Sequence, residues 1–253
     1  MWWEERCSGC RNCQNECPRD AISFLHNALL IDQNGCDMCG LCVETCPSQA
    51  LQVVGEEVVI SQVIQEIEKD MVFYDESGGG ATLSGGEPLM QPEFSQALLK
   101  SCKELKIHTT LDTCGYAQFD ILSKMCEHAD LILYDLKVIN DEKHVKHTGV
   151  SNRLILDNLK QLLKNGQDVL IRFPLIPGVN NNEQDIEELG IFVSSMDKVQ
   201  EISILPYHKA GVEKLKRLTH SKNSFLMGHS TPIEMDEIEK RLKSYGLKIR
   251  VGA

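Results

Sequence analysis

The sequence lacks the features that would direct a chain to a membrane, and it is short of positive charge. No apolar run among the 253 residues is long enough to cross a bilayer. Residues 1–6 read Met-Trp-Trp-Glu-Glu-Arg, so they have no apolar core of a signal peptide. With 26 basic and 37 acidic residues the formal net charge is -11, which argues against nucleic acid or an anionic membrane as the main partner.

Cysteine, by contrast, is abundant, and most of it lies near the N-terminus. Two runs share the pattern Cys-x2-Cys-x2-Cys-x3-Cys-Pro, and they begin at Cys7 and Cys36. In such runs the three closely spaced thiols bind one iron–sulfur cluster, while the fourth thiol, before proline, binds the other. The spacing therefore predicts two 4Fe-4S clusters with crossed ligands. The first set is Cys7, Cys10, Cys13 and Cys46, and the second is Cys36, Cys39, Cys42 and Cys17.

Structural zinc and disulfides are the alternatives for these cysteines. Zinc sites usually use two separated cysteine pairs rather than three cysteines in one run. Disulfides do not suit a chain without secretion features. Thiolate-bound clusters predict a reducing, cytoplasmic and anaerobic setting instead. The three other cysteines are expected to pack, Cys114 in a loop and Cys102 and Cys126 as buried helix residues.

Beyond the cysteine runs, the apolar pattern predicts alternating strands and helices. Strands are expected at 81–83, 108–111, 131–134, 169–173 and 202–205, with a last short strand at 247–251. The first helix should begin at an N-cap on Ser61 and end at Gly78. Further helices are expected at 92–106, through Leu122 and Met125, at 151–164, at 183–195 and at 233–245. This βα alternation indicates a parallel sheet.

The expected organisation is therefore α/β, with two domains. Residues 1–58 should form a ferredoxin-like domain with a hairpin over 24–31, and residues 59–253 a partial (β/α) barrel. In such barrels the chemistry gathers at the carboxyl ends of the strands. Five successive strands end here in polar groups: Gly85-Gly86-Glu87, Asp112-Thr113, Asp135 with Lys137, Arg172, and His208. A purely structural sheet does not need charge at every strand end, so the set is predicted to be functional.

Taken in order, these motifs resemble those of the glycyl-radical-enzyme activating enzymes, the pyruvate formate-lyase activating enzyme-like group of the radical S-adenosylmethionine superfamily. The resemblance rests on Gly-Gly-Gly-Ala-Thr-Leu-Ser-Gly-Gly-Glu-Pro at 78–88, Asp-Thr-Cys-Gly-Tyr at 112–116, Asp-Leu-Lys at 135–137 and Leu-Pro-Tyr-His at 205–208. It implies a (β/α)6-type barrel, here lacking its first strand. The cysteine region corresponds to the ferredoxin insert that many members carry.

The resemblance also implies an activity and its partners. Members cleave S-adenosylmethionine reductively to a 5'-deoxyadenosyl radical, which takes a hydrogen atom from a glycine of a partner glycyl radical enzyme. A flavodoxin- or ferredoxin-type donor would supply the electron, which the ferredoxin clusters would pass on. No nucleic acid and no membrane are expected among the partners.

Particular roles follow from the same resemblance. Three residues would hold the methionyl amino group of S-adenosylmethionine, mainly through backbone that only glycine lets approach closely: Gly85, Gly86 and Glu87. Four would hold the ribose and the methionyl end: Asp135, Leu136, Lys137 and His208. Arg172 would contact the nucleoside. A monovalent cation would lie near Asp112, Thr113 and Asp135. The plainer alternatives are a salt bridge between Asp135 and Lys137 and an ordinary loop histidine at position 208.

One feature of the family is missing. Members carry a Cys-x3-Cys-x2-Cys run that holds a third, site-differentiated 4Fe-4S cluster. In this sequence Cys13 and Cys17 have the spacing of the first two cysteines of such a run, but Asp20 occupies the position of the third. We therefore expect a truncated form that binds about eight irons, two clusters' worth, and does not itself cleave S-adenosylmethionine. A lineage without this cluster, or one that receives it from another polypeptide, is the alternative. A ferredoxin-type electron-transfer protein and a non-catalytic remnant that only grips the partner are the other functional readings.

Overall fold

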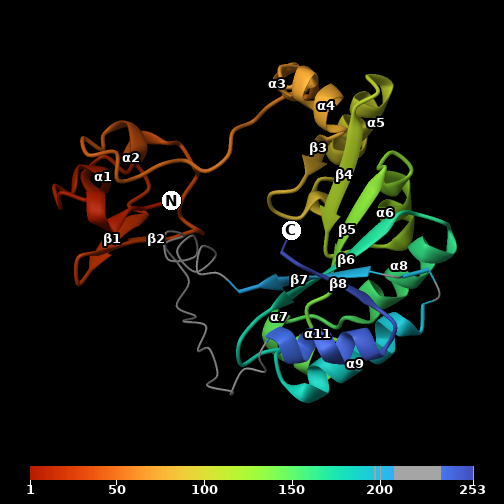
Figure 1. Ribbon diagram of the computed structural model, residues 1–253. Helices are drawn as coiled ribbons and strands as arrows, with labels where there is room; N and C mark the ends of the chain where they lie inside the picture. Colours follow the sequence, from red (N-terminus) through yellow and green to blue (C-terminus); the bar gives the residue numbers. More distant parts are fainter. Residues whose placement is uncertain (197, 200, 208–234, 253) are drawn as a thin grey trace. The chain divides into compact units, whose positions relative to one another are not determined.

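The computed structural model describes residues 1–196, 198–199, 201–207 and 235–252 (Figure 1). Its contacts divide the chain into two compact units, one comprising Met1–Glu57 and the other comprising Val58–Tyr207 together with the described residues from Met235 onward. Each unit has its own hydrophobic core. Within the described ranges no helix is both long and apolar enough to span a membrane.

The N-terminal unit consists of an antiparallel hairpin and three short helical segments. Strand β1 (Ile22–Leu25) pairs with β2 (Ala28–Ile31), which confirms the predicted hairpin. The segments are η1 (Glu4–Arg6), α1 (Asn12–Asn15) and α2 (Leu41–Glu44). An isolated bridge between Trp2 and Leu51 joins the beginning of the unit to its closing stretch.

The second unit is built on a six-stranded parallel sheet in the order β3-β4-β5-β6-β7-β8. Its strands are β3 (Gly80–Leu83), β4 (His108–Thr113), β5 (Leu131–Asp135), β6 (Val169–Leu175), β7 (Glu201–Pro206) and β8 (Lys248–Val251). All six lie where the sequence predicts them. Consecutive strands are neighbours throughout, which is the strand order of a (β/α) barrel. Strands β4 and β5 extend further than predicted, so Asp112 and Asp135 lie within them at their carboxyl ends. Arg172 lies inside a strand, as predicted, but β6 continues to Leu175, so Arg172 is in the middle of that strand rather than at its end.

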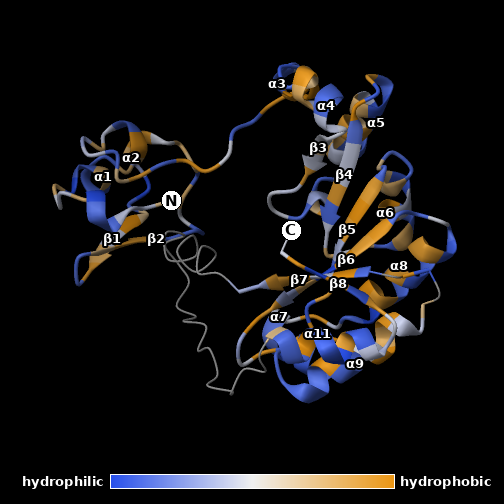
Figure 2. Ribbon diagram, in the orientation of Figure 1, coloured by the Kyte–Doolittle hydropathy of each residue, from blue (hydrophilic) through white to orange (hydrophobic). Residues whose placement is uncertain are grey.

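Helices cover the sheet and enclose the core. They are α3 (Ile60–Glu68), α4 (Met71–Ser77), η2 (Pro88–Met90), α5 (Pro92–Glu104), α6 (Phe119–Cys126), α7 (Asp141–Thr148), α8 (Arg153–Lys164), α9 (Glu183–Ser194) and α11 (Met235–Ser244). Figure 2 shows hydrophobic and hydrophilic residues together on helices such as α9 and α11, as expected for helices with one buried face. Strand residues Leu111, Ile132 and Ile171 and helix residues Leu159 and Leu189 are fully buried in this core.

Three local expectations need correction. Ser61 is not the N-cap of the first helix, because that position belongs to Val59, whose N–H donates to Gln62 Oε1 at 2.9 Å. The stretch from 60 to 77 forms two helices rather than one, although the second does end at Gly78. Helix α7 was not predicted, since its sequence Asp-Glu-Lys-His-Val-Lys-His-Thr has no apolar periodicity. Asn140 caps it instead, with Oδ1 accepting from Lys143 N–H at 3.0 Å.

Candidate functional site

The two cysteine runs follow the same backbone path. Corresponding positions lie in the left-handed region in both: Gly9 and Met38, Arg11 and Gly40, Asp20 and Gln49. In each run an alanine N–H donates to the sulfur of the fourth cysteine. Ala21 donates to Cys17 Sγ at 3.4 Å, and Ala50 donates to Cys46 Sγ at 3.2 Å. The internal repeat therefore extends from the sequence to the conformation, and it orients both fourth thiols in the same way.

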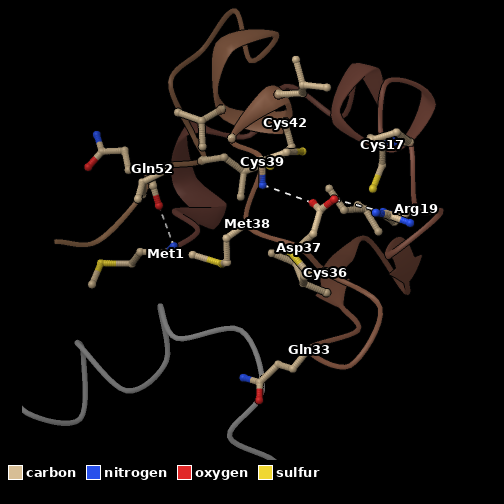
Figure 3. Close-up of a pocket in the computed structure, with 18 of the residues that line it drawn as sticks. Met1, Cys17, Arg19, Gln33, Cys36, Asp37, Met38, Cys39, Cys42 and Gln52 are labelled. Carbon is tan, nitrogen blue, oxygen red and sulfur yellow. Dashed lines mark hydrogen bonds and ion pairs between the residues drawn. The ribbon is translucent and has the colours of Figure 1, made fainter. Parts of the chain in front are cut away.

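The eight thiols line two separate cavities. One is lined by Cys17, Cys36, Cys39 and Cys42 (Figure 3), and the other by Cys7, Cys10, Cys13 and Cys46. Each cavity thus takes three thiols from one run and the fourth from the other. All eleven cysteines of the chain are free thiols. Within the described ranges no three Cys, His, Asp or Glu side chains gather as ligands of a single metal ion.

The donor chemistry fits a multi-iron cluster better than a single ion. Each thiolate of a four-iron cluster binds a different iron, so its ligands do not need to converge on one point. The space for a cluster differs between the cavities, however. The cavity lined by Cys17, Cys36, Cys39 and Cys42 has a volume of about 580 Å³ and is called the wide cavity below. The cavity lined by Cys7, Cys10, Cys13 and Cys46 has a volume of about 10 Å³ and is called the narrow cavity. A cluster would therefore have to move side chains apart in the second case, where the exposed Cys10 offers the least hindered path.

The wide cavity has a polar connection between the two runs. Asp37 lies between two cysteines of the second run, and its Oδ1 accepts from Cys39 N–H at 3.2 Å. Its Oδ2 accepts from Arg19 Nε at 3.0 Å, and Arg19 follows Cys17-Pro18 (Figure 3). The side chain of Asp37 therefore ties the loop of the fourth thiol to the loop of the other three. Arg19 lowers the pKa of Asp37, together with the Cys39 N–H, so the carboxylate is charged at neutral pH.

The narrow cavity is enclosed mainly by apolar groups. Trp2, Leu29 and Leu51 are buried in its wall, and the half-exposed Phe24 lies beside them. Burial raises the pKa of the Cys13 thiol to about 11, and neighbouring Cys46, Cys10 and Cys42 add to the rise. Metal binding here must therefore displace a proton from a neutral thiol.

The pKa of Cys46, the fourth thiol of the same cavity, is shifted in the opposite direction to that of Cys13. Burial favours its neutral form, but several hydrogen bonds together outweigh burial and lower the pKa of Cys46. Their donors are the Leu51 N–H, the Ser48 hydroxyl, the Ala50 N–H and the Ser48 N–H. The loop after Pro47 is thus shaped to hold a thiolate at this position.

In the second unit, Glu87 joins the ends of two neighbouring strands. Its Oε1 accepts from Thr113 Oγ1 at 2.6 Å and from Leu89 N–H at 3.3 Å, and its Oε2 accepts from Cys114 N–H at 2.9 Å. The carboxylate therefore fixes the loop after β3 against the end of β4. This role was not predicted, because a sequence does not reveal which strand-end groups lie across from one another.

The glycines before Glu87 leave their surroundings open. Among the described residues, a Cβ added to Gly85 or to Gly86 would meet no atom within 4 Å apart from those of its chain neighbours. Gly85 has a φ of +110°, which accounts for glycine at that position. Gly86 has no such backbone requirement. Nothing in the described protein therefore demands glycine at position 86, and the backbone there is accessible to a ligand.

Arg172, in the middle of β6, joins the carboxyl ends of β4 and β5. It pairs with Asp135 across adjacent strands, with Nε and one terminal nitrogen lying 2.9 and 2.8 Å from Asp135 Oδ1. The same terminal nitrogen also donates to Asp112 Oδ1. Asp112 Oδ2 accepts from Ser84 Oγ at 3.3 Å, and Lys137 Nζ lies 4.0 Å from Asp135 Oδ2. Four of the predicted residues therefore belong to one charged network.

Burial and charge compete in this network. Burial raises the pKa of Asp135, while the positive charges of Arg172 and Lys137 oppose the rise. Burial alone would lower the pKa of Arg172, but its pairs with Asp135 and Asp112 outweigh burial and raise it. Arg172 therefore stays charged and holds the two carboxylates together.

The remaining predicted residues are placed differently. The Leu136 side chain is buried in the core, and its N–H donates to Arg172 O at 2.9 Å. His208 lies outside the described residues. Cys102 and Cys126 are buried, as expected. Cys114 is only half buried and lies beside Glu87. Burial, and in second place the hydrogen bond with Glu87, raise the pKa of its thiol to about 11.

A further cavity of about 140 Å³ adjoins this network and contains a residue that the sequence did not single out. Cys114, Asp135 and Lys137 line it together with His144 of α7. His144 is buried, and its Nδ1 lies 2.8 Å from Val150 O, so Nδ1 carries the proton. The polar sequence of α7 gave no signal that this histidine would be buried.

Comparison with known sequences shows two family matches. Residues 33–190 match the Radical SAM superfamily, and residues 3–47 match a 4Fe-4S dicluster domain. The chain is 38% identical to the trans-4-hydroxy-L-proline dehydratase activating enzyme of Clostridioides difficile, over 100% of this chain and 84% of that protein. It is also 38% identical to the choline trimethylamine-lyase activating enzyme of Oleidesulfovibrio alaskensis, over 97% of this chain and 88% of that protein.

Comparison with solved structures agrees with the sequence matches. A domain of pyruvate-formate lyase-activating enzyme from Bacteroides vulgatus superposes with a TM-score of 0.57 at 32% identity, covering 69% of this chain and 99% of that domain. A radical SAM methyltransferase from Sphaerobacter thermophilus has a TM-score of 0.54 at 15% identity and covers 80% of this chain and 60% of its own. At that identity the second likeness concerns the fold alone.

Proposed function

Because the chain belongs to the glycyl-radical-enzyme activating enzymes of the radical SAM superfamily, we propose that its strand ends bind S-adenosylmethionine and that its N-terminal unit carries two 4Fe-4S clusters as an electron feed. The protein substrate is a glycyl radical enzyme, and a flavodoxin- or ferredoxin-type protein is the proposed electron donor. Bound S-adenosylmethionine supplies the radical chemistry once it has received an electron.

The observation that carries this proposal is the open backbone at Gly86. The conformation there does not require glycine, and an added Cβ would meet none of the described residues within 4 Å, its chain neighbours aside. Glu87 holds this loop in place through Thr113 and the Cys114 N–H. The glycine at position 86 is explained if a ligand group, such as the methionyl amino group, lies directly on the backbone of this loop, because a side chain there would keep the ligand away.

The charged network supports the same proposal. S-adenosylmethionine carries a positive sulfonium, a positive amino group and a negative carboxylate. Asp135 and Lys137 are proposed to hold its ribose and methionyl end, with backbone groups of Leu136 and with His208. Arg172 is proposed to contact the nucleoside while it fixes Asp112 and Asp135. A monovalent cation bound by Asp112, Thr113 and Asp135 would share these carboxylates with Arg172.

In the N-terminal unit, the two cavities support the crossed ligand sets. Cys7, Cys10, Cys13 and Cys46 are proposed to hold one cluster, and Cys36, Cys39, Cys42 and Cys17 the other. The N–H groups of Ala21 and Ala50 would orient the two fourth thiolates. Bound clusters supply one-electron transfer. No Cys-x3-Cys-x2-Cys run occurs in the 253 residues, so this chain alone is not expected to cleave S-adenosylmethionine.

The test is equilibrium binding of S-adenosylmethionine to the cluster-loaded chain, measured by calorimetry. We expect Gly86→Val to weaken binding at least about tenfold, or roughly 1.4 kcal/mol. His108→Val is the control, because His108 is exposed at the amino end of β4, away from the strand ends that form the site. Equal affinities for wild type and Gly86→Val, or no binding at all, would favour an electron-transfer protein without a nucleotide site.

A further inference from the structure

Trp2 is fixed in the wall of the narrow cysteine cavity. Its side chain is 7% exposed and belongs to the core of the N-terminal unit, with Cys13, Leu29 and Leu51. The backbone bridge from Trp2 to Leu51 sets its position, and the neighbouring Trp3 N–H donates to Ala50 O at 2.8 Å. Trp2 thus approaches the cavity from a strand-like segment rather than from either cysteine loop.

The indole N–H of Trp2 has no hydrogen-bond partner in the described part of the chain. Four buried polar side-chain atoms share this property: Trp2 Nε1, Thr45 Oγ1, Asn158 Oδ1 and Tyr207 Oη. Of these four residues, Trp2 lines a cysteine cavity, the one formed by Cys7, Cys10, Cys13 and Cys46. Buried donors are normally paired, so an unpaired indole N–H at this position points to an acceptor that belongs to the ligand of the cavity.

The chemistry of the site narrows that acceptor to sulfur. An indole nitrogen can only donate, and the core side chains that pack with Trp2 are apolar or thiols. The cavity lining also includes the hydroxyls of Ser8 and Ser48, but neither accepts from the indole N–H. A 4Fe-4S cluster brings sulfide and thiolate sulfurs, which accept N–H hydrogen bonds. Such bonds stabilise the more negative, reduced cluster and raise its reduction potential.

We propose that the indole N–H of Trp2 donates a hydrogen bond to a sulfur of the cluster held by Cys7, Cys10, Cys13 and Cys46, and that this bond raises the reduction potential of that cluster. The inference rests on the crossed ligand assignment proposed above. Among the described residues that line the wide cavity there is no tryptophan, so the two clusters of one repeat would differ in reduction potential.

Isotope labelling tests the contact directly, because the chain has two tryptophans, Trp2 and Trp3. Trp3 does not line the cavity, and the Arg6 guanidinium lies 5.2 Å from the centre of its ring. In Trp3→Phe protein labelled with indole-¹⁵N, Trp2 carries the single label. We expect the dithionite-reduced protein to show a ¹⁵N hyperfine coupling in pulsed EPR. Trp2→Phe protein with the same label should lack it, and a coupling absent from the Trp3→Phe protein would overturn the proposal.

Redox titration tests the consequence. At a fixed potential near the midpoint, we expect Trp2→Phe to lower the reduced-to-oxidised ratio of one cluster about tenfold, equivalent to about 59 mV for one electron. The other cluster should keep its potential, and Trp3→Phe should change neither. Unchanged potentials in Trp2→Phe protein would contradict the proposal. Iron content separates this failure from the failure of its premise, since about four irons in the wild type would refute the two-cluster assignment itself.

Discussion

The two cysteine cavities of the N-terminal unit have the same motif and the same backbone path but different surroundings. The wide one holds about 580 Å³ and is crossed by a charged contact between Arg19 and Asp37. The narrow one holds about 10 Å³ and is closed by Trp2 and other buried apolar groups. A sequence repeat therefore determines which atoms bind the metal, while the side chains outside the repeat determine how each cluster is packed, hydrated and tuned.

The two cavities should differ most in how much the stability of the unit falls when a side chain that lines them is shortened. Leu29 is 2% exposed, so we expect Leu29→Ala to reduce the free energy of unfolding of the N-terminal unit by about 2–5 kcal/mol. Guanidinium unfolding followed by cluster absorbance measures this. Met38 lines the wide cavity and is 71% exposed, and it provides the matched control. Met38→Ala should change stability by less than about 0.5 kcal/mol, and equal losses would show that the cavities do not differ in packing.

A smaller, selective effect is expected at the wide cavity. Asp37→Ala removes the acceptor of both the Cys39 N–H and Arg19, so the loops that carry Cys17 and Cys39 lose their connection. Groups that orient metal ligands typically matter about 10–100-fold for metal affinity, and we expect a loss in this range for one cluster. Chelator competition with iron readout measures it. Asp32→Ala, whose carboxylate accepts from Asn34 N–H, is the control. Loss of both clusters together would mean that Asp37 acts on the whole unit.

The smallest effect is expected at Ser48, next to the narrow cavity. Its hydroxyl lies 3.7 Å from Cys46 Sγ, and the equivalent residue after Cys17 is Arg19. We expect Ser48→Ala to weaken retention of one cluster by about 0.5–1.5 kcal/mol, the usual net value of one hydrogen bond. The same chelator assay should show the cluster of the wide cavity unchanged. Were that cluster the one affected, Cys46 would belong to the wide cavity.

Much of this organisation could be read from the sequence. The cysteine spacing predicted two sets of four thiols, and the apolar pattern predicted all six strands of the sheet. Helix α7 and its buried His144 could not be predicted, since caps and tertiary contacts rather than apolar periodicity hold them. The pairing of Glu87 with Thr113 depends on residues far apart in the chain. The burial of Trp2 could not be predicted from the sequence either, because it depends on a backbone bridge to Leu51.

The most direct test of the account is EPR spectroscopy of the reduced chain with one cysteine replaced at a time. The crossed arrangement predicts that Cys46→Ala removes or alters the same cluster signal as Cys13→Ala. It likewise predicts that Cys17→Ala affects the same signal as Cys42→Ala. If Cys46→Ala instead reproduces Cys42→Ala, each run binds its own cluster, and the arrangement of thiols around the two cavities does not describe the loaded protein.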